Sequence, residues 1–158
     1  MDKITPNLWF NDTAEEAVNF YVGLFPDSRV DAVHSAPADN PSVKKGEVLF
    51  IEFTLGGRSF AAINGGPAFP FTEAVSFSIE CEDQAEVDRY WEALTGNGGQ
   101  AVQCGWCKDR FGLSWQVVPR RLRELMSDTD PAVAERVMQA MMGMVRLDVA
   151  ALEAAARG

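Results

Sequence analysis

Cysteine, histidine and carboxylate side chains are the groups in this sequence that could carry chemistry. Cys104 and Cys107 have the C-x-x-C spacing of a dithiol redox pair or of half a zinc site. A redox pair usually begins a helix, whose N-terminus lowers the thiol pKa, whereas the pattern here predicts a strand before the pair and a hairpin after it. Zinc would need two further donors, and Cys81 and His34 are the candidates that remain. We therefore expect reduced, buried thiols and keep a thiol redox protein that uses Cys104 and Cys107 as an alternative.

The histidine and the carboxylates do not form a recognisable catalytic set. His34 is the single histidine of the chain and falls in an expected edge strand, and one imidazole makes neither a triad nor a metal site. Glu52 interrupts an otherwise apolar strand, where a carboxylate on the inward face could act as a general base after burial raises its pKa. A solvated edge position is the simpler interpretation of Glu52.

The segment 103–119 is expected to position the most conspicuous polar residue, Gln116. A turn over residues 109–112 ends in a glycine that can adopt positive φ, and residues 113–118 form a strand rich in β-branched and aromatic side chains. Alternation places Trp115 on one face of this strand and Gln116 on the other. Both side chains can line one pocket only if a bulge intervenes.

The elements before this hairpin are predicted to occur twice in the same order. The first set is a strand over 4–10, a helix from a capping box at Thr13–Glu16 to about Leu24, a strand over 29–36, and a hairpin over 48–64 turned at two glycines. The second set has a strand over 75–81, a capping box at 83–86, a helix and the hairpin above. The helices match at an offset of about 70 residues and the hairpins at about 55, which indicates an internal duplication. The second helix is expected to bury Val87, Tyr90, Trp91 and Leu94.

Three short helices are predicted after Pro119. The first covers 120–126, the second is capped by Asp130 with Pro131 at its first position, and the third begins at Asp148. The second helix has an apolar side that either packs on the sheet of its own domain or makes a dimer contact, and the two uses are compatible. That side consists of Val133, Val137, Ala140, Met141 and Met144.

Composition limits the classes of partner. The 158 residues fit one domain with a core, and 23 acidic against 14 basic residues give a formal charge of −9, which repels nucleic acid and anionic lipid. No apolar run is long enough to span a bilayer, and the first residues lack the pattern of a signal peptide. We expect a cytoplasmic protein that binds neither nucleic acid nor membranes.

Several motifs together resemble the PhnB-like family. This family carries the label 3-demethylubiquinone-9 3-methyltransferase and belongs to the vicinal oxygen chelate superfamily of glyoxalases, bleomycin-resistance proteins and extradiol dioxygenases. The motifs that carry the resemblance are Ile4–Phe10, Ala14–Ala17 ahead of Phe20 and Tyr21, Asp83–Asp88 with Tyr90 and Trp91, Cys104–Trp106, and Asp109–Pro119.

The resemblance implies an α+β fold of two tandem βαβββ modules that form a curved mixed sheet around a cleft, in a single domain over 1–158 and usually in a homodimer. Module one would cover about 3–66, module two about 72–119, and the helical appendix about 120–158. A methyl donor of the adenosyl type usually needs a glycine-rich turn between a strand and a helix, and the glycine pairs here fall in or after hairpins.

The resemblance also locates the metal ligands of the superfamily, which are His or Glu on the first and last strand of each module. The corresponding positions here are Thr5 or Asn7, Ala61, Ala74 or Ser76, and Gln116, none of which is an imidazole or a carboxylate. We therefore expect no metal and no other cofactor, and keep a metal-dependent lyase or dioxygenase as the alternative. The expected function is binding of a small, partly apolar molecule, with the reaction unassigned. The expected ligand-binding residues are Asn7, Trp9, Ser76, Gln103, Trp106 and Gln116.

Overall fold

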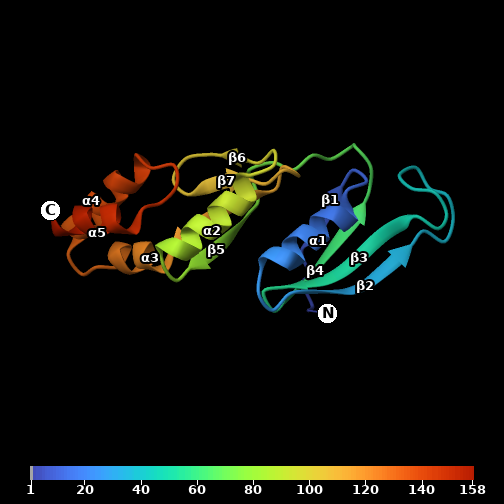
Figure 1. The fold of residues 1–158 in the computed structure, drawn as a ribbon, viewed down its shortest axis with the longest axis horizontal. Helices are drawn as coiled ribbons and strands as arrows, with labels where there is room; N and C mark the ends of the chain where they lie inside the picture. The colour runs from blue at the N-terminus through green and yellow to red at the C-terminus, as the bar shows by residue number, and fades with distance from the viewer. Residues whose placement is uncertain (1) are drawn as a thin grey trace. The chain divides into compact units, whose positions relative to one another are not determined.

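The structure is a computed structural model that describes residues 2–158, and its chain forms two compact units. The first unit ends at Phe71 and the second begins at Thr72. Each unit contains one four-stranded mixed sheet and a helix that packs on it (Figure 1). The predicted α+β fold with two repeated modules is therefore confirmed, and the strands form one separate sheet in each module.

Module one has the order β1, α1, β2, β3, β4. The elements are β1 (Asn7–Phe10), α1 (Ala14–Leu24), β2 (Arg29–Ser35), β3 (Val48–Leu55) and β4 (Arg58–Asn64). The sheet order is β1-β4-β3-β2, with β1 parallel to β4 and the other pairs antiparallel. The first strand is shorter than the predicted range 4–10. The hairpin between β3 and β4 turns at Gly56 and Gly57, which both have positive φ as predicted.

Module two repeats this arrangement. Its elements are β5 (Ser76–Cys81), α2 (Gln84–Thr95), β6 (Gln100–Ala101), β7 (Trp106–Lys108) and β8 (Ser114–Pro119). The sheet order is β5-β8-β7-β6, and the parallel pair β5–β8 corresponds to β1–β4. The counterpart of β2 is reduced to the two residues of β6.

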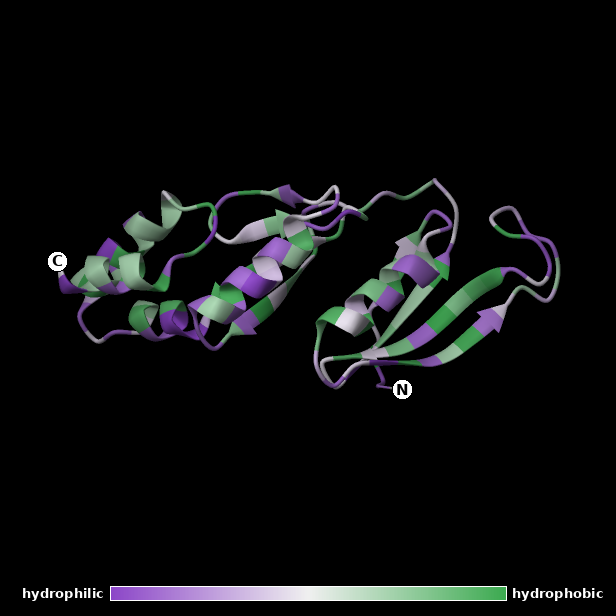
Figure 2. Ribbon diagram, in the orientation of Figure 1, coloured by the Kyte–Doolittle hydropathy of each residue, from purple (hydrophilic) through white to green (hydrophobic). Residues whose placement is uncertain are grey.

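One helix covers one face of each sheet and leaves the other face open. Figure 2 shows that α1 and α2 each contain both hydrophilic and hydrophobic residues, as expected for amphipathic helices that bury one side. All four residues predicted for the buried side of α2 are buried, namely Val87, Tyr90, Trp91 and Leu94. We call the sheet surface opposite α1 or α2 the open face.

The start of α1 differs from the prediction. Thr13 precedes the helix but its hydroxyl makes no capping hydrogen bond, so the predicted capping box is wrong. The side-chain oxygen of Asn64, at the end of β4, accepts from the backbone N–H of Ala14 at 2.9 Å instead. The second box forms as predicted at its cap, because Asp83 accepts from the backbone N–H of Glu86.

The C-terminal helices form a small core of their own. They are α3 (Arg120–Met126), α4 (Pro131–Met142) and α5 (Val149–Arg157), with the predicted aspartate caps at Asp130 and Asp148. The apolar side of α4 packs mainly into this core, and contact with the sheet is made through Val118 of β8. The buried residues of the core are Leu122, Leu125, Val137, Leu147 and Leu152. Within residues 2–158, no helix is both long and apolar enough to cross a bilayer.

Candidate functional site

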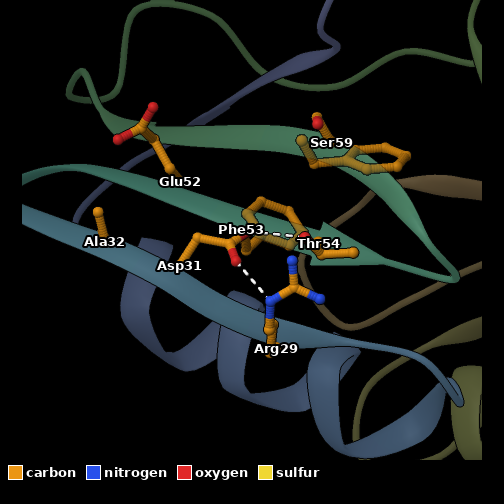
Figure 3. Close-up of a pocket in the computed structure, with 8 residues that line it drawn as sticks. Arg29, Asp31, Ala32, Glu52, Phe53, Thr54 and Ser59 are labelled. Atoms are coloured by element: carbon orange, nitrogen blue, oxygen red, sulfur yellow. Dashed lines mark hydrogen bonds and ion pairs between the residues drawn. The ribbon is translucent and has the colours of Figure 1, made fainter. Parts of the chain in front are cut away.

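A groove of about 330 Å³ lies on the open face of module one (Figure 3). Its walls come from β2, β3 and β4. The lining is mostly polar, and it includes two carboxylates, a guanidinium and two hydroxyls. These groups belong to Asp31, Glu52, Arg29, Thr54 and Ser59.

Asp31 is the fixed polar centre of the groove. Arg29 Nε lies 2.7 Å from Asp31 Oδ1, and the hydroxyl of Thr54 donates to Asp31 Oδ2 at 2.7 Å. Figure 3 shows both interactions as dashed lines, the first within β2 and the second between β2 and β3. The charge of Asp31 is therefore balanced by Arg29, and both of its oxygens have partners.

Glu52 is the second carboxylate of the groove, and its partner is His34. Nε2 of His34 lies 2.8 Å from Glu52 Oε2, and the side chain of Glu52 is 28% exposed. Glu52 belongs to β3, which lies between β2 and β4, so the edge position considered for it is wrong. Sequence reasoning had placed His34 correctly in the edge strand but could not pair it with Glu52.

A β-bulge in β2 brings these groups to one face. The register shifts between Val30 and Ala32, so that Val30 pairs with Phe53 while Ala32 pairs with Glu52. Without the shift, strict alternation would put His34 on the face opposite Arg29 and Asp31. The irregularity in β2 therefore assembles the polar groove.

Of the predicted site residues, Asn7 and Trp9 lie on β1 in module one. Asn7 is exposed and pairs in register with Ala61 of β4. Trp9 is half-buried under the segment that follows β4, where its indole N–H donates to the carbonyl of Gly66 at 2.9 Å. A Cβ on Gly65 would lie 2.2 Å from the Trp9 ring, so this contact requires glycine. Trp9 thus anchors a loop with its polar atom already engaged.

Three further predicted residues share the open face of module two. The side-chain amide of Gln116 donates to the hydroxyl of Ser76 at 3.0 Å, and Trp106 is the cross-strand partner of Gln116. All three are partly exposed. The residue opposite Gln116 in register is Ser78, so Ser78 and Gln116 correspond to Asn7 and Ala61 of module one. Sequence reasoning missed Ser78, since only the pairing register identifies it.

Gln103 is exposed and lies in a turn before β7, away from these strand positions. Its carbonyl accepts from the backbone N–H of Trp106 at 3.0 Å. The two central residues of the turn, Cys104 and Gly105, have positive φ, and their N–H groups donate to the carbonyls of Met144 and Val145. The turn therefore docks on the segment between α4 and α5.

A buried aspartate holds the hairpin that carries Gln116. Asp109 is 2% exposed, and its Oδ1 accepts from the backbone N–H groups of Phe111 and Leu113 at 2.9 and 3.1 Å. Its Oδ2 accepts from the indole N–H of Trp115 at 2.9 Å. Trp115 is buried and Gln116 half-buried, as the predicted alternation requires. Sequence reasoning treated Asp109 as a turn residue and did not identify this role.

The thiols do not have the environment of a redox pair. Burial raises the pKa of Cys107 to about 12, and the nearby charge of Asp109 adds to the effect. Burial also raises the pKa of Cys81 to about 12, with a further contribution from Glu86. Cys107 lies in β7 rather than at the start of a helix. A buried thiol with a raised pKa is a poor nucleophile near neutral pH, which opposes the redox alternative.

The residues at the superfamily metal positions do not fit a divalent ion. Asn7 and Ala61 are adjacent on β1 and β4, and Ser76 and Gln116 are hydrogen-bonded on β5 and β8. These groups are two amides, a hydroxyl and a methyl, whereas divalent ions need imidazole or carboxylate donors. Thr5 and Ala74, the other positions considered, lie outside β1 and β5. In residues 2–158 no three His, Cys, Asp or Glu side chains are grouped so as to hold a metal ion.

Comparison with solved structures identifies relatives of the two modules. A PhnB protein from Bacillus cereus, designated as a 3-demethylubiquinone-9 3-methyltransferase, is 33% identical with a TM-score of 0.67, and the match covers 75% of this chain and 99% of that one. Protein PA1353 from Pseudomonas aeruginosa is 24% identical with a TM-score of 0.55, and the match covers 75% and 98% of the two chains, which shows a shared fold. No curated protein matches the chain.

The sequence profile of the 3-demethylubiquinone-9 3-methyltransferase family matches residues 2–118. This range contains both modules and ends before α3, so the three C-terminal helices lie outside the match. The profile match and the similarity to the Bacillus cereus protein agree with the resemblance in the motifs. The chain belongs to the 3-demethylubiquinone-9 3-methyltransferase family, the PhnB-like family.

Proposed function

We propose that the chain binds a small, partly apolar organic molecule on the open faces of its sheets, through amides, hydroxyls and indoles rather than through a metal ion. The observation that supports this most is the arrangement of Gln116, Ser76 and Trp106 on the open face of module two. A flat apolar ring beside a few oriented polar groups is the usual composition of a small-molecule site.

The hydrogen bond to Ser76 orients the amide of Gln116. Because its Nε2 donates to Ser76, the amide is held with Oε1 as an acceptor, and no residue within 2–158 donates to that oxygen. The hydroxyl of Ser76 accepts from Gln116 and can still donate its own proton. A ligand that offers one donor and one acceptor next to an apolar ring would match this pair of groups and Trp106.

The other predicted contacts belong to the same proposal with different roles. Asn7 presents an exposed amide on the open face of module one, and Gln103 presents one in the turn before β7. Trp9 would contribute ring surface, since its N–H is engaged by Gly66. We include in the proposal the homodimer and the cytoplasmic location that the sequence suggested. Light scattering on purified protein tests the dimer.

The family is named after a methyltransferase, but we do not assign methyl transfer to this chain. Gly56 and Gly57 turn the hairpin between β3 and β4, and Gly65 and Gly66 follow β4. Neither pair lies in a turn from a strand into a helix, which is where an adenosyl methyl donor is usually held. The proposal is therefore a binding function with no reaction assigned.

The test combines a ligand screen with one pair of variants. Purified protein is screened by thermal shift against aromatic metabolites and divalent metals, since a ligand of the native state raises the melting temperature. The affinity of the strongest organic hit is then measured for Gln116→Leu, which removes the amide at similar volume. We expect binding about tenfold weaker, the loss that corresponds to one well-placed hydrogen bond.

Gln139→Leu is the matched control, because Gln139 is exposed on α4 and outside both modules. It should bind the hit as the unmodified chain does. Elemental analysis of dialysed protein provides the decisive contrary result. About one divalent ion retained per chain would overturn the proposal in favour of a metal-dependent lyase or dioxygenase, and equal affinity in the two glutamine variants would remove Gln116 from the site.

A further inference from the structure

We propose that the groove on the open face of module one is a separate binding site for a small organic cation, a protonated amine with an apolar part, and that Glu52 is the residue that binds the ammonium group. The site is formed by β2, β3 and β4 alone. It contains none of the six residues of the proposed function, so the two proposals stand or fall independently.

The two carboxylates of the groove differ in how fully their oxygens are engaged. Asp31 is neutralised by Arg29 at 2.7 Å, and its second oxygen accepts from Thr54. Within residues 2–158 the carboxylate of Glu52 is bonded to the imidazole of His34, which engages Oε2 and leaves Oε1 available to a ligand. The imidazole of His34 therefore orients the carboxylate through one oxygen, and the other oxygen can accept a hydrogen bond from an ammonium group.

The position of Glu52 favours a ligand over bulk water. Its side chain is 28% exposed and belongs to β3, one of the two inner strands, with Ala32 and Ala61 as its cross-strand neighbours. A partly buried carboxylate interacts with a cation more strongly than an exposed one, because less water screens the pair. A volume of about 330 Å³ is at the lower end of small-molecule sites, which suits a compact ligand.

The remaining lining suggests how the rest of the ligand is held. Ala32, the half-buried cross-strand neighbour of Glu52, contributes apolar surface, and the hydroxyl of Ser59 can donate or accept. Arg29 is 69% exposed at the other end of the lining, where its pairing with Asp31 reduces its attraction for an anion. The geometry thus selects a cationic group near Glu52 with an apolar group beside it.

Three probes of similar size and different charge test the inference on the full chain. Benzylamine is a cation near neutral pH, benzyl alcohol is neutral and benzoate is an anion. Each is titrated into isotopically labelled protein, and the amide shifts in the proton–nitrogen NMR spectrum are followed. We expect benzylamine to shift the amide signals of β2, β3 and β4. Benzyl alcohol should bind with an affinity at least about tenfold lower, because it lacks the charge-assisted hydrogen bond.

Two charge-removing variants separate a specific site from general attraction to an acidic protein. Glu52→Gln should lower the affinity for benzylamine about tenfold. Glu92→Gln, which removes an exposed charge on α2, should leave that affinity unchanged. A thermal melt of each variant checks that it is folded. Tighter binding of benzoate, benzylamine shifts that are absent or scattered over the chain, or equal affinity in the two variants would each overturn the inference. Loss of the Gln116 site in the earlier experiment would leave these results unaffected.

Discussion

Asp109 should be the most sensitive single position of module two, and Asp109→Asn tests this with almost no change of shape. Asp109 is 2% exposed, and its carboxylate accepts from two backbone N–H groups through Oδ1 and from the indole N–H of Trp115 through Oδ2. Asparagine has one acceptor oxygen and one NH₂ group. One of the two carboxylate positions must therefore become a donor that faces another donor.

The expected loss of stability in Asp109→Asn depends on which of the two carboxylate oxygens is replaced by the NH₂ group. If the new amide keeps its oxygen toward Phe111 and Leu113, the indole N–H of Trp115 is left without an acceptor. A buried donor without a partner costs about 1–3 kcal/mol, and the two retained bonds weaken because their acceptor is no longer charged. The opposite orientation leaves two backbone N–H groups unpaired and costs more. We expect module two to lose about 2–4 kcal/mol of unfolding free energy.

Urea unfolding followed by NMR signals of module two measures this loss, and the indole N–H signal of Trp115 reports on the broken contact directly. Asp12→Asn is the control, because Asp12 is exposed with φ of 59°, a conformation that asparagine tolerates well. A loss below about 0.5 kcal/mol for Asp109→Asn, similar to the change expected at an ordinary surface position, would refute the reasoning.

Two further predictions concern the start of α1 and the thiols. Asn64→Leu should destabilise module one by about 2–4 kcal/mol, because the side chain of Asn64 accepts from the N–H of Ala14 and donates to the carbonyl of Val48. Thr13→Val should cost under about 0.5 kcal/mol, because the Thr13 hydroxyl makes no capping hydrogen bond. Equal losses of unfolding free energy for the two variants in urea would contradict this assignment. Burial raises the pKa of Cys107 from 9.0 to about 12, so above pH 9 the unfolded chain releases a proton that the folded chain keeps, and stability should fall as pH rises from 9 to 12. Cys107→Ala should reduce that slope without abolishing it, because the pKa of Cys81 is raised to about 12 as well, and an unchanged slope would show that the Cys107 thiol does not contribute.

The sequence predicted those elements whose signals are local. The second capping residue, the glycine hairpin and the aspartate caps of α4 and α5 each depend on residues a few positions apart, and the structure contains all of them. The cap of α1 was wrong because its acceptor, Asn64, is 50 positions away from Ala14. The sequence pattern around Thr13 contains no information about Asn64, which comes close to Ala14 only when the sheet folds.

The same distinction explains the candidate sites. Alternation along one strand was enough to separate Trp115 from Gln116, because β8 has no irregularity between them. The groove depends on a bulge in β2, which breaks alternation and which no turn residue or glycine marks in the sequence. His34 and Glu52 therefore looked like unrelated residues, although they are in hydrogen-bond contact.

The two modules have diverged in a way that assigns different chemistry to their open faces. In module one the amide is on the first strand at Asn7 and a methyl is opposite at Ala61, whereas in module two a hydroxyl at Ser78 faces the amide of Gln116. The carboxylate of module one lies one strand further in, at Glu52, which pairs with Ala61.

The length of the second strand in each module explains why the groove forms on module one and not on module two. β2 has seven residues and supplies one wall, while its counterpart β6 has two, and the turn that follows β6 is tied to the segment before α5 instead. β6 is too short to form the wall that a matching groove would need, and the segment between α4 and α5, which lies beyond the family match, contacts the adjoining turn. The two repeated modules therefore share a scaffold, and the different lengths of β2 and β6 explain why a polar groove lies on module one and an amide surface on module two.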